Sequence, residues 1–168
     1  MKKLLKPGRL ALIFGILVLI GVFAYYYFQV NNPHRVRVFF FKGEMLQSVD
    51  RPLLNTEDPL MVAARELILG PTATELQQGF MTEIPKKARV LSVRKQGSTA
   101  AIDFSPELQN YGGGSARVRG LIAQIVFTLS DVHGVKQVKI LVSGRNEVVL
   151  GGEGLMIDRP LSREDLRF

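Results

Sequence analysis

The longest apolar run of the chain covers residues 10–28 and reads LALIFGILVLIGVFAYYYF, without a charge or a proline. A helix rises about 1.5 Å per residue, so this run would extend roughly 28 Å, close to the hydrocarbon thickness of a bilayer. The pattern therefore predicts one transmembrane helix, with the rest of the chain on one side of the membrane.

The flanks of this run predict its orientation. Basic residues precede it, and no acidic residue occurs before Glu44. The positive-inside rule then places the N-terminus in the cytoplasm and the body outside the cytoplasmic membrane. A signal peptide cleaved near Ala24 is the alternative, and it exports the same body. We expect five segments: a basic cytoplasmic flank at 1–9, a transmembrane helix at 10–28, a linker at 29–35, a domain at 36–161 and a tail at 162–168.

In the body, apolar residues recur every second position, as in strands, or every third to fourth, as in helices. Helices are predicted to begin at the caps Asp58, Thr74 and Ser115. The order of the predicted strands and helices along the chain is β-α-β-β-α-β with an additional hairpin. This order predicts an α+β fold with two helices packed on one face of a single sheet. Strands are predicted at 35–41, 46–54, 89–94, 99–104, 138–142 and, as an edge strand, 147–150.

Two segments are regular enough to predict which side chains are buried. In the hairpin of 89–94 and 99–104, alternation places Leu91 and Val93 on the inner face. The second strand of that hairpin buries Ala100, Ile102 and Phe104. The buried face of the long second helix is expected to consist of Leu121, Ile122, Ile125, Val126 and Leu129.

Charge and composition narrow the function classes. The net charge is +7, but four of the 22 basic residues precede the apolar run, so the body is only mildly basic. We therefore expect no nucleic-acid partner. The chain has no cysteine, which excludes disulfides, thiol catalysis and a lipid-modified N-terminal cysteine. Its two histidines, His34 and His133, lack the spacing of metal ligands, and we expect no metal or cofactor.

Two carboxylates are the only candidates for catalysis. Asp103 and Glu107 lie near the predicted end of the hairpin, where an acid and a base could in principle hydrolyse a glycan. Pairs of carboxylates are common in proteins without catalysis, and we interpret both residues as structural.

Two further segments are candidates for a ligand or partner surface, and the exposed face of the sheet is a better candidate than either. Gly113, Gly114 and Ser115 precede a helix and could present backbone amides to an anion, or form a tight loop with a serine cap. Val148 and Val149 lie on the predicted edge strand, which could pair with a neighbouring strand.

The body also carries a series of short segments in a fixed order. They are DPL at 58–60, ELILGPT at 66–72, TEIP at 82–85, VLSV at 90–93, AIDFS at 101–105, GGS at 113–115, QIVFTL at 124–129, GVKQV at 134–138 and ILVSG at 140–144. Together they resemble the GerMN domain, a module of sporulation and spore germination proteins. The resemblance implies an extracytoplasmic bacterial domain related to ring-building folds, with an envelope role and without an established catalytic site.

The resemblance and the apolar run together predict a single-pass bacterial membrane protein that displays one GerMN-like domain. Members of the family in spore formers often carry two copies on a lipoprotein, whereas this chain has one copy after a transmembrane run. We expect the domain to bind envelope proteins, including further copies of itself. The alternatives are a module that binds peptidoglycan for a wall-remodelling enzyme and, more remotely, a glycan hydrolase that uses Asp103 and Glu107.

Overall fold

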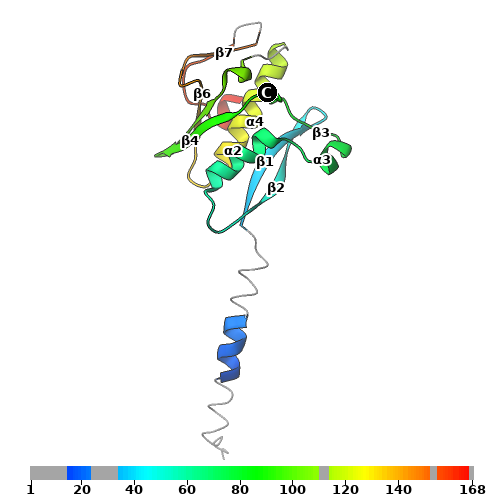
Figure 1. Ribbon diagram of the computed structural model, residues 1–168, viewed down its shortest axis with the longest axis vertical. Helices are drawn as coiled ribbons and strands as arrows, with labels where there is room; N and C mark the ends of the chain where they lie inside the picture. The colour runs from blue at the N-terminus through cyan, green and yellow to red at the C-terminus, as the bar shows by residue number, and fades with distance from the viewer. Residues whose placement is uncertain (1–14, 24–33, 110–113, 152–154, 167–168) are drawn as a thin grey trace, which may run out of the picture. The chain divides into compact units, whose positions relative to one another are not determined.

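The computed structural model describes residues 15–23, 34–109, 114–151 and 155–166 (Figure 1). The chain divides into two compact units, Met1–His34 and Arg35–Phe168. In the first unit, residues 15–23 are helical. No helix in the described part of the chain has the length and apolar character needed to cross a bilayer. The remainder of the predicted transmembrane helix, residues 10–14 and 24–28, lies outside the described residues.

The strands of the body form three small sheets, so the prediction of a single sheet is wrong. The first sheet has the order β2-β1-β3, the second β4-β5-β6 and the third β7-β8. The pair β4-β5 is antiparallel and the pair β5-β6 is parallel. The strand bounds are β1 His34–Lys42, β2 Met45–Leu53, β3 Phe80–Met81, β4 Val90–Gln96, β5 Thr99–Phe104, β6 Gln137–Val142, β7 Val148–Leu150 and β8 Leu155–Ile157.

The body has three α-helices among its described residues, α2 Pro59–Leu69, α3 Ala73–Gln77 and α4 Ser115–Ser130, and two short 3-10 helices at Pro106–Leu108 and Arg163–Leu166. Asp58 caps α2 as predicted, because its carboxylate accepts a hydrogen bond from the Leu60 amide. The predicted cap Thr74 is wrong: Thr72 caps α3, since it forms a reciprocal capping box with Glu75. The predicted cap Ser115 is also wrong, because Ser115 is already helical and Gly114 occupies the cap position.

A β-bulge changes the inner face of the first strand in the predicted hairpin. Val93 is buried as expected, but the side chain of Leu91 is 53% exposed. Val90 pairs with Phe104 and Ser92 with Asp103, so Leu91 is an additional residue on β4. One extra residue reverses the alternation of a strand, and this turns Leu91 outward and brings Val90 against the core.

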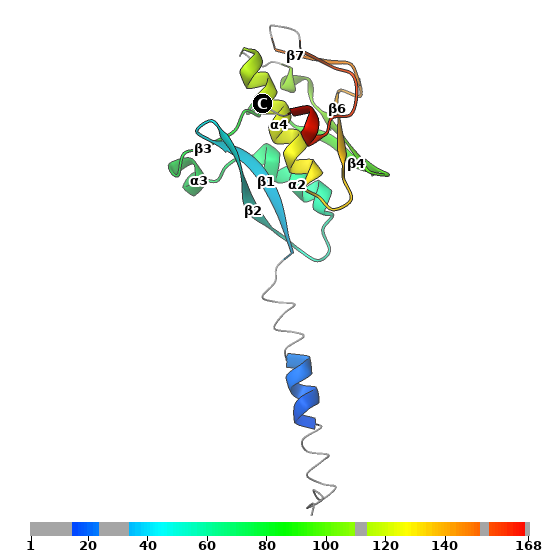
Figure 2. The ribbon, with the colours of Figure 1, turned by 180° about the vertical axis from the view of Figure 1, so that it is seen from behind.

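Helix α4 lies at the centre of the body, between the first and second sheets (Figures 1 and 2). Its predicted face is buried as expected, with Leu121, Ile125 and Leu129 fully so. The opposite side contacts β1, where the Phe127 ring meets the Phe39 ring edge-on at 5.7 Å between centroids. The helix is therefore covered on both sides.

Two buried polar residues of α4 explain why the sheets are not continuous. The Thr128 hydroxyl accepts a hydrogen bond from the Phe39 amide at 3.0 Å, and the Gln124 amide donates to the Phe39 carbonyl at 3.1 Å. The Gln124 side-chain oxygen also accepts from the Glu83 amide at 2.6 Å. Because side chains of α4 supply the hydrogen-bond partners of the Phe39 amide and carbonyl, these groups of β1 do not require a neighbouring strand.

The C-terminal segment packs on the domain rather than extending beyond it. Leu161 exchanges backbone hydrogen bonds with Val138 on β6, both of 2.8 Å. The Arg163 guanidinium donates to the Phe127 carbonyl and to Asp131 at the end of α4, and its charge lies near the rings of Phe39 and Phe127. A cation at the C-terminal end of a helix is favourable because of the helix dipole.

Candidate binding surface

Asp103 has a structural contact of its own. It lies on β5, and both of its carboxylate oxygens accept hydrogen bonds from the Gly144 amide, at 3.0 and 3.1 Å. This contact holds the turn that follows β6, in which Ser143 and Gly144 adopt positive φ angles. The carboxylate therefore anchors a turn at the end of the second sheet.

Glu107 is placed in the short 3-10 helix after β5. The Ser105 hydroxyl donates to its carboxylate and holds the pKa of Glu107 below its ordinary value, with further contributions from the backbone and from Arg89 and Lys87. Arg89 lies 3.9 Å from the nearer carboxylate oxygen. Asp103 lines a hollow of the sheet to which Glu107 does not contribute. The structure thus gives the two carboxylates separate contacts.

The glycine-rich candidate is only partly described. Gly113 lies outside the described residues, and Gly114 has extended backbone at the cap position of α4. Ser115 is the exposed first residue of the helix, and the cap position makes no side-chain hydrogen bond.

The candidate residues on β7 differ from each other in exposure. Val148 is 1% exposed and belongs to the core, whereas Val149 is 43% exposed. β7 pairs antiparallel with β8 in a two-stranded sheet, so it is an edge strand as predicted, with a partner that the sequence analysis did not predict. The sequence analysis did not predict β8, because a strand of three residues is too short to show a periodic pattern of apolar residues.

The outer face of the second sheet is open, which makes it the strongest candidate surface. Its inner face is covered by α2 and α4, which contact β4 and β6 respectively. The outer face carries mainly small and polar side chains around a hollow of about 220 Å³. We call this surface the open sheet face; the hollow is lined by Ser92, Arg94, Gln96, Ala101, Asp103, Lys139, Leu141 and Gly144.

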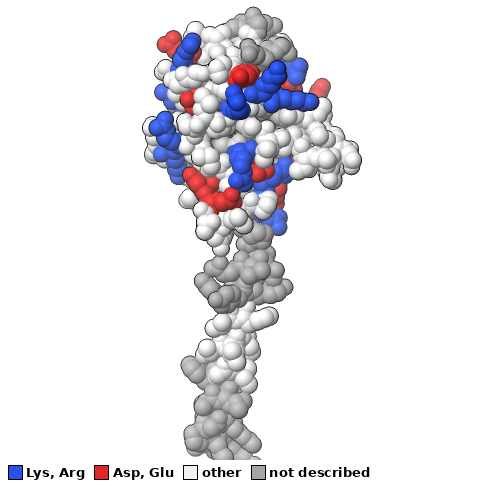
Figure 3. Space-filling model, viewed as in Figure 1, with Lys and Arg blue, Asp and Glu red and all other residues white. Residues whose placement is uncertain are grey.

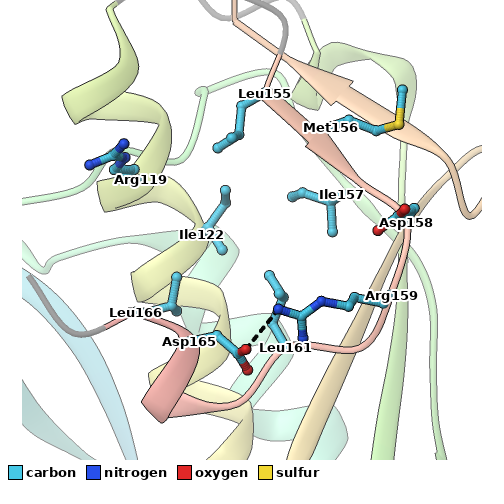
Figure 4. A pocket seen from close by; sticks show the side chains of 10 residues that line it. All are labelled: Arg119, Ile122, Leu155, Met156, Ile157, Asp158, Arg159, Leu161, Asp165 and Leu166. Atoms are coloured by element: carbon cyan, nitrogen blue, oxygen red, sulfur yellow. Dashed lines mark hydrogen bonds and ion pairs between the residues drawn. The ribbon is translucent and has the colours of Figure 1, made fainter.

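A second hollow, of about 310 Å³, lies between α4 and the C-terminal segment (Figure 4). Ile122, Ile157, Leu161 and Leu166 make its centre apolar. Four charged residues also line it, and two of them, Arg159 and Asp165, form an ion pair of 2.8 Å with each other. The hollow therefore offers a ligand apolar contact at its centre, and Arg119 and Asp158 are the other charged groups in its lining.

A buried arginine connects three elements and is a residue that the sequence analysis missed. Arg51 on β2 is 7% exposed and donates to both carboxylate oxygens of Glu75 on α3, at 2.6 and 2.7 Å. It also lies 3.3 Å from Glu66 on α2. The hydrogen bond to Glu75 raises the pKa of Arg51, and the same bond lowers the pKa of Glu75. These groups are all partnered, so the cluster stabilises the fold rather than forming a site.

The described residues contain no cluster of three or more His, Asp or Glu side chains that could hold a metal ion. Fold and surface together define an α+β domain in which one face of the second sheet is left open.

The family is shown by comparison with known proteins. Residues 25–148 match the model of the family described as sporulation and spore germination, and the chain belongs to this family. The spore germination protein GerM of Bacillus subtilis is 29% identical over 117 residues, which cover 68% of this chain and 31% of GerM. The chain thus spans about a third of the length of this relative.

Solved structures of the same relative share the fold. The first GerMN domain of GerM from Bacillus subtilis has a TM-score of 0.63 at 23% identity, covering 79% of this chain and 99% of the domain. The tandem GerMN domains of GerM give the same TM-score and identity, covering 77% of this chain and 45% of that structure. The resemblance noted in the sequence is therefore confirmed: the body is a GerMN domain.

Proposed function

We propose that this chain is a membrane-tethered GerMN domain that acts outside the cytoplasm, by binding protein partners in a cell-envelope assembly of the sporulation type. The observation that carries the proposal is the open sheet face. One side of the second sheet is sealed by two helices, while the other presents mainly small and polar side chains to solvent. The name of the Bacillus relative, which refers to spore germination, supports the envelope context.

The tether is the second part of the proposal. It rests on the uncharged run at 10–28 and on the basic residues before it, which favour a cytoplasmic N-terminus. Confinement to a membrane surface raises the effective concentration of the domain near its partners, so that weak contacts are sufficient for assembly. This suits a domain whose candidate binding surface is one small face of a sheet.

The substitution Glu107→Gln tests whether the domain acts by binding. It removes one of the two candidate catalytic charges, keeps the side-chain size and lies outside the hollow of the open sheet face, which Asp103 lines. We expect the cellular function of the full chain to be retained, because a glycan hydrolase needs both carboxylates whereas the open sheet face does not include Glu107. Loss of function, with an unchanged circular dichroism spectrum and loss of a hydrolytic activity on purified wall polymer, would support the hydrolase instead.

A further inference from the structure

We propose that the outer edge of β4, with the apolar groove beside it, binds an extended acidic segment of a protein partner, which adds a strand to the second sheet. The proposal rests on the binding function proposed above and names the chemistry of the partner.

The outer edges of the sheets in the described body differ in whether another segment hydrogen-bonds to them or a proline interrupts them. Leu161 makes two backbone hydrogen bonds to the outer edge of β6, and β7 and β8, which pair with each other, are only three residues long each. β2 is also an edge strand, but Pro52 interrupts its backbone donors. β4 is the outer strand in the order β4-β5-β6, and none of the described strands pairs with its free side.

An apolar groove of about 410 Å³ runs beside this edge, between β4 and α2. Its walls include the large apolar side chains of Met61, Leu69 and Leu91, which are 48%, 69% and 53% exposed. The bulge places Leu91 here, since regular alternation would have buried it. Exposed large apolar side chains next to a free strand edge fit a peptide that hydrogen-bonds through its backbone and inserts an apolar side chain.

The basic residues near β4 indicate that the partner segment bound there is acidic. Five cations, Lys86, Lys87, Arg89, Arg94 and Lys95, lie on β4 or in the four residues before it, and no acidic residue occurs between Glu83 and Asp103. Arg89 lines the groove itself, and Arg94 lines the adjacent open sheet face. Among the described residues, these cations make one ion pair, the 3.9 Å contact of Arg89 with Glu107. Figure 3 shows Lys and Arg side chains, with Asp and Glu side chains among them, around an uncharged area over α2 and β4. Cations on an edge strand repel the same edge of a second copy and attract an acidic strand.

Binding of a synthetic peptide tests this directly. The probe is a fluorescein-labelled decapeptide of alternating glutamate and valine with one central leucine, titrated into the full chain in detergent and followed by anisotropy. We expect saturable binding that weakens steeply with salt. The same peptide with lysine for glutamate should bind at least tenfold more weakly, and so should a peptide N-methylated at alternate residues, which cannot extend the sheet.

Matched variants locate the site. Leu91→Asp should weaken peptide binding at least tenfold, because it places an acid beside the apolar anchor. Leu76→Asp introduces the same charge on α3 at a side chain of similar exposure, 56%, and should leave binding unchanged. Equal effects of the two substitutions, or binding that is indifferent to the peptide's charge, would overturn the proposal. So would binding of anionic phospholipid vesicles that competes with the peptide and is lost in the same variant.

A comparison in cells separates this proposal from the broader one. A photoreactive residue at Leu91 should capture a protein through an acidic segment, which mass spectrometry of the cross-linked peptide would identify. Protein adducts from the open sheet face at Lys139, without any from Leu91, would refute the β4 site and leave the proposed function standing. The absence of protein adducts from both positions would refute both.

Discussion

At the scale of single residues, the stability of the body depends on polar groups that a hydrophobic pattern does not reveal. Gln124 and Thr128 are both fully buried, four residues apart on α4, and face the backbone of β1. The sequence does contain a sign of them, because they are the two polar residues in the otherwise apolar stretch 120–129 of α4. Their partners on β1 and in the loop after β3 are 41 to 89 residues distant and follow only from the fold.

Gln124→Leu should therefore destabilise the body strongly. It leaves the Phe39 carbonyl and the Glu83 amide without their partner, and each unsatisfied buried group costs about 1–3 kcal/mol. We expect a loss of about 2–4 kcal/mol in urea unfolding of residues 35–168, which form a compact unit. Gln77→Leu, at an exposed position of α3, should change stability by less than about 0.5 kcal/mol. Similar losses of stability in both variants would show that the hydrogen bonds of Gln124 do not cause the destabilisation.

The cluster of Arg51 and Glu75 predicts a dependence on pH. Arg51 lowers the pKa of Glu75 in the folded state, so the charged pair stabilises the fold above pH 4.5, the ordinary value for this carboxyl group. This contribution is lost as the pH falls through the lowered pKa of the folded state. Glu75→Gln should cost about 2 kcal/mol at pH 7, and the difference from the wild type should shrink progressively below pH 4.5.

Urea unfolding at several pH values measures this, and Glu44→Gln, at an exposed residue of the first turn, is the control. The control should follow the wild-type curve at every pH. If the free energies of unfolding of Glu75→Gln and the wild type differed by the same amount at every pH down to 2, the lowered pKa of Glu75 would be contradicted.

At the scale of elements, local patterns predicted much of the fold, whereas long-range pairing did not follow from them. The cap of α2, the buried face of α4 and the hairpin of β4 and β5 lie close to their predicted positions, because helix periodicity and turn residues are local properties. The bulge at Leu91, the division into three sheets and the pairing of β7 with β8 depend on contacts between distant segments. The open sheet face was predicted as a surface, but the groove beside β4 was not, because it arises from the bulge.

The contact between α4 and β1 sets a limit on side-chain size at Gly120. A Cβ atom at this position would lie 3.2 and 3.3 Å from two carbons of the Phe41 ring. Gly120→Val should separate the helix from the strand and destabilise the body by about 1–3 kcal/mol, the usual cost of overpacking. Ala116→Val, exposed in the first turn of α4, is the control and should have little effect on thermal unfolding. A stability gain from Gly120→Val would mean that the two elements are not tightly packed.

At the scale of the whole molecule, the proposed function combines a membrane tether with a binding domain. A topology reporter fused after Phe168 should be active only outside the cytoplasm, because the basic flank before residue 10 favours a cytoplasmic N-terminus. The mature protein should keep its first residues, as N-terminal sequencing or intact mass would show. A product that begins near Tyr25 would favour the cleaved signal peptide, and reporter activity inside the cell would refute export.

The central claim is that the exported domain works by contact with other proteins, and photo-cross-linking from its open sheet face tests this most directly. A photoreactive residue replaces Lys139 in the full chain, expressed in its own membranes, and Gln77 on α3 serves as the control position. The account predicts a discrete protein adduct from Lys139 that is absent from Gln77. Adducts with wall glycan alone, or no protein adduct from either Lys139 or Leu91 in cells where the variants remain functional, would contradict it.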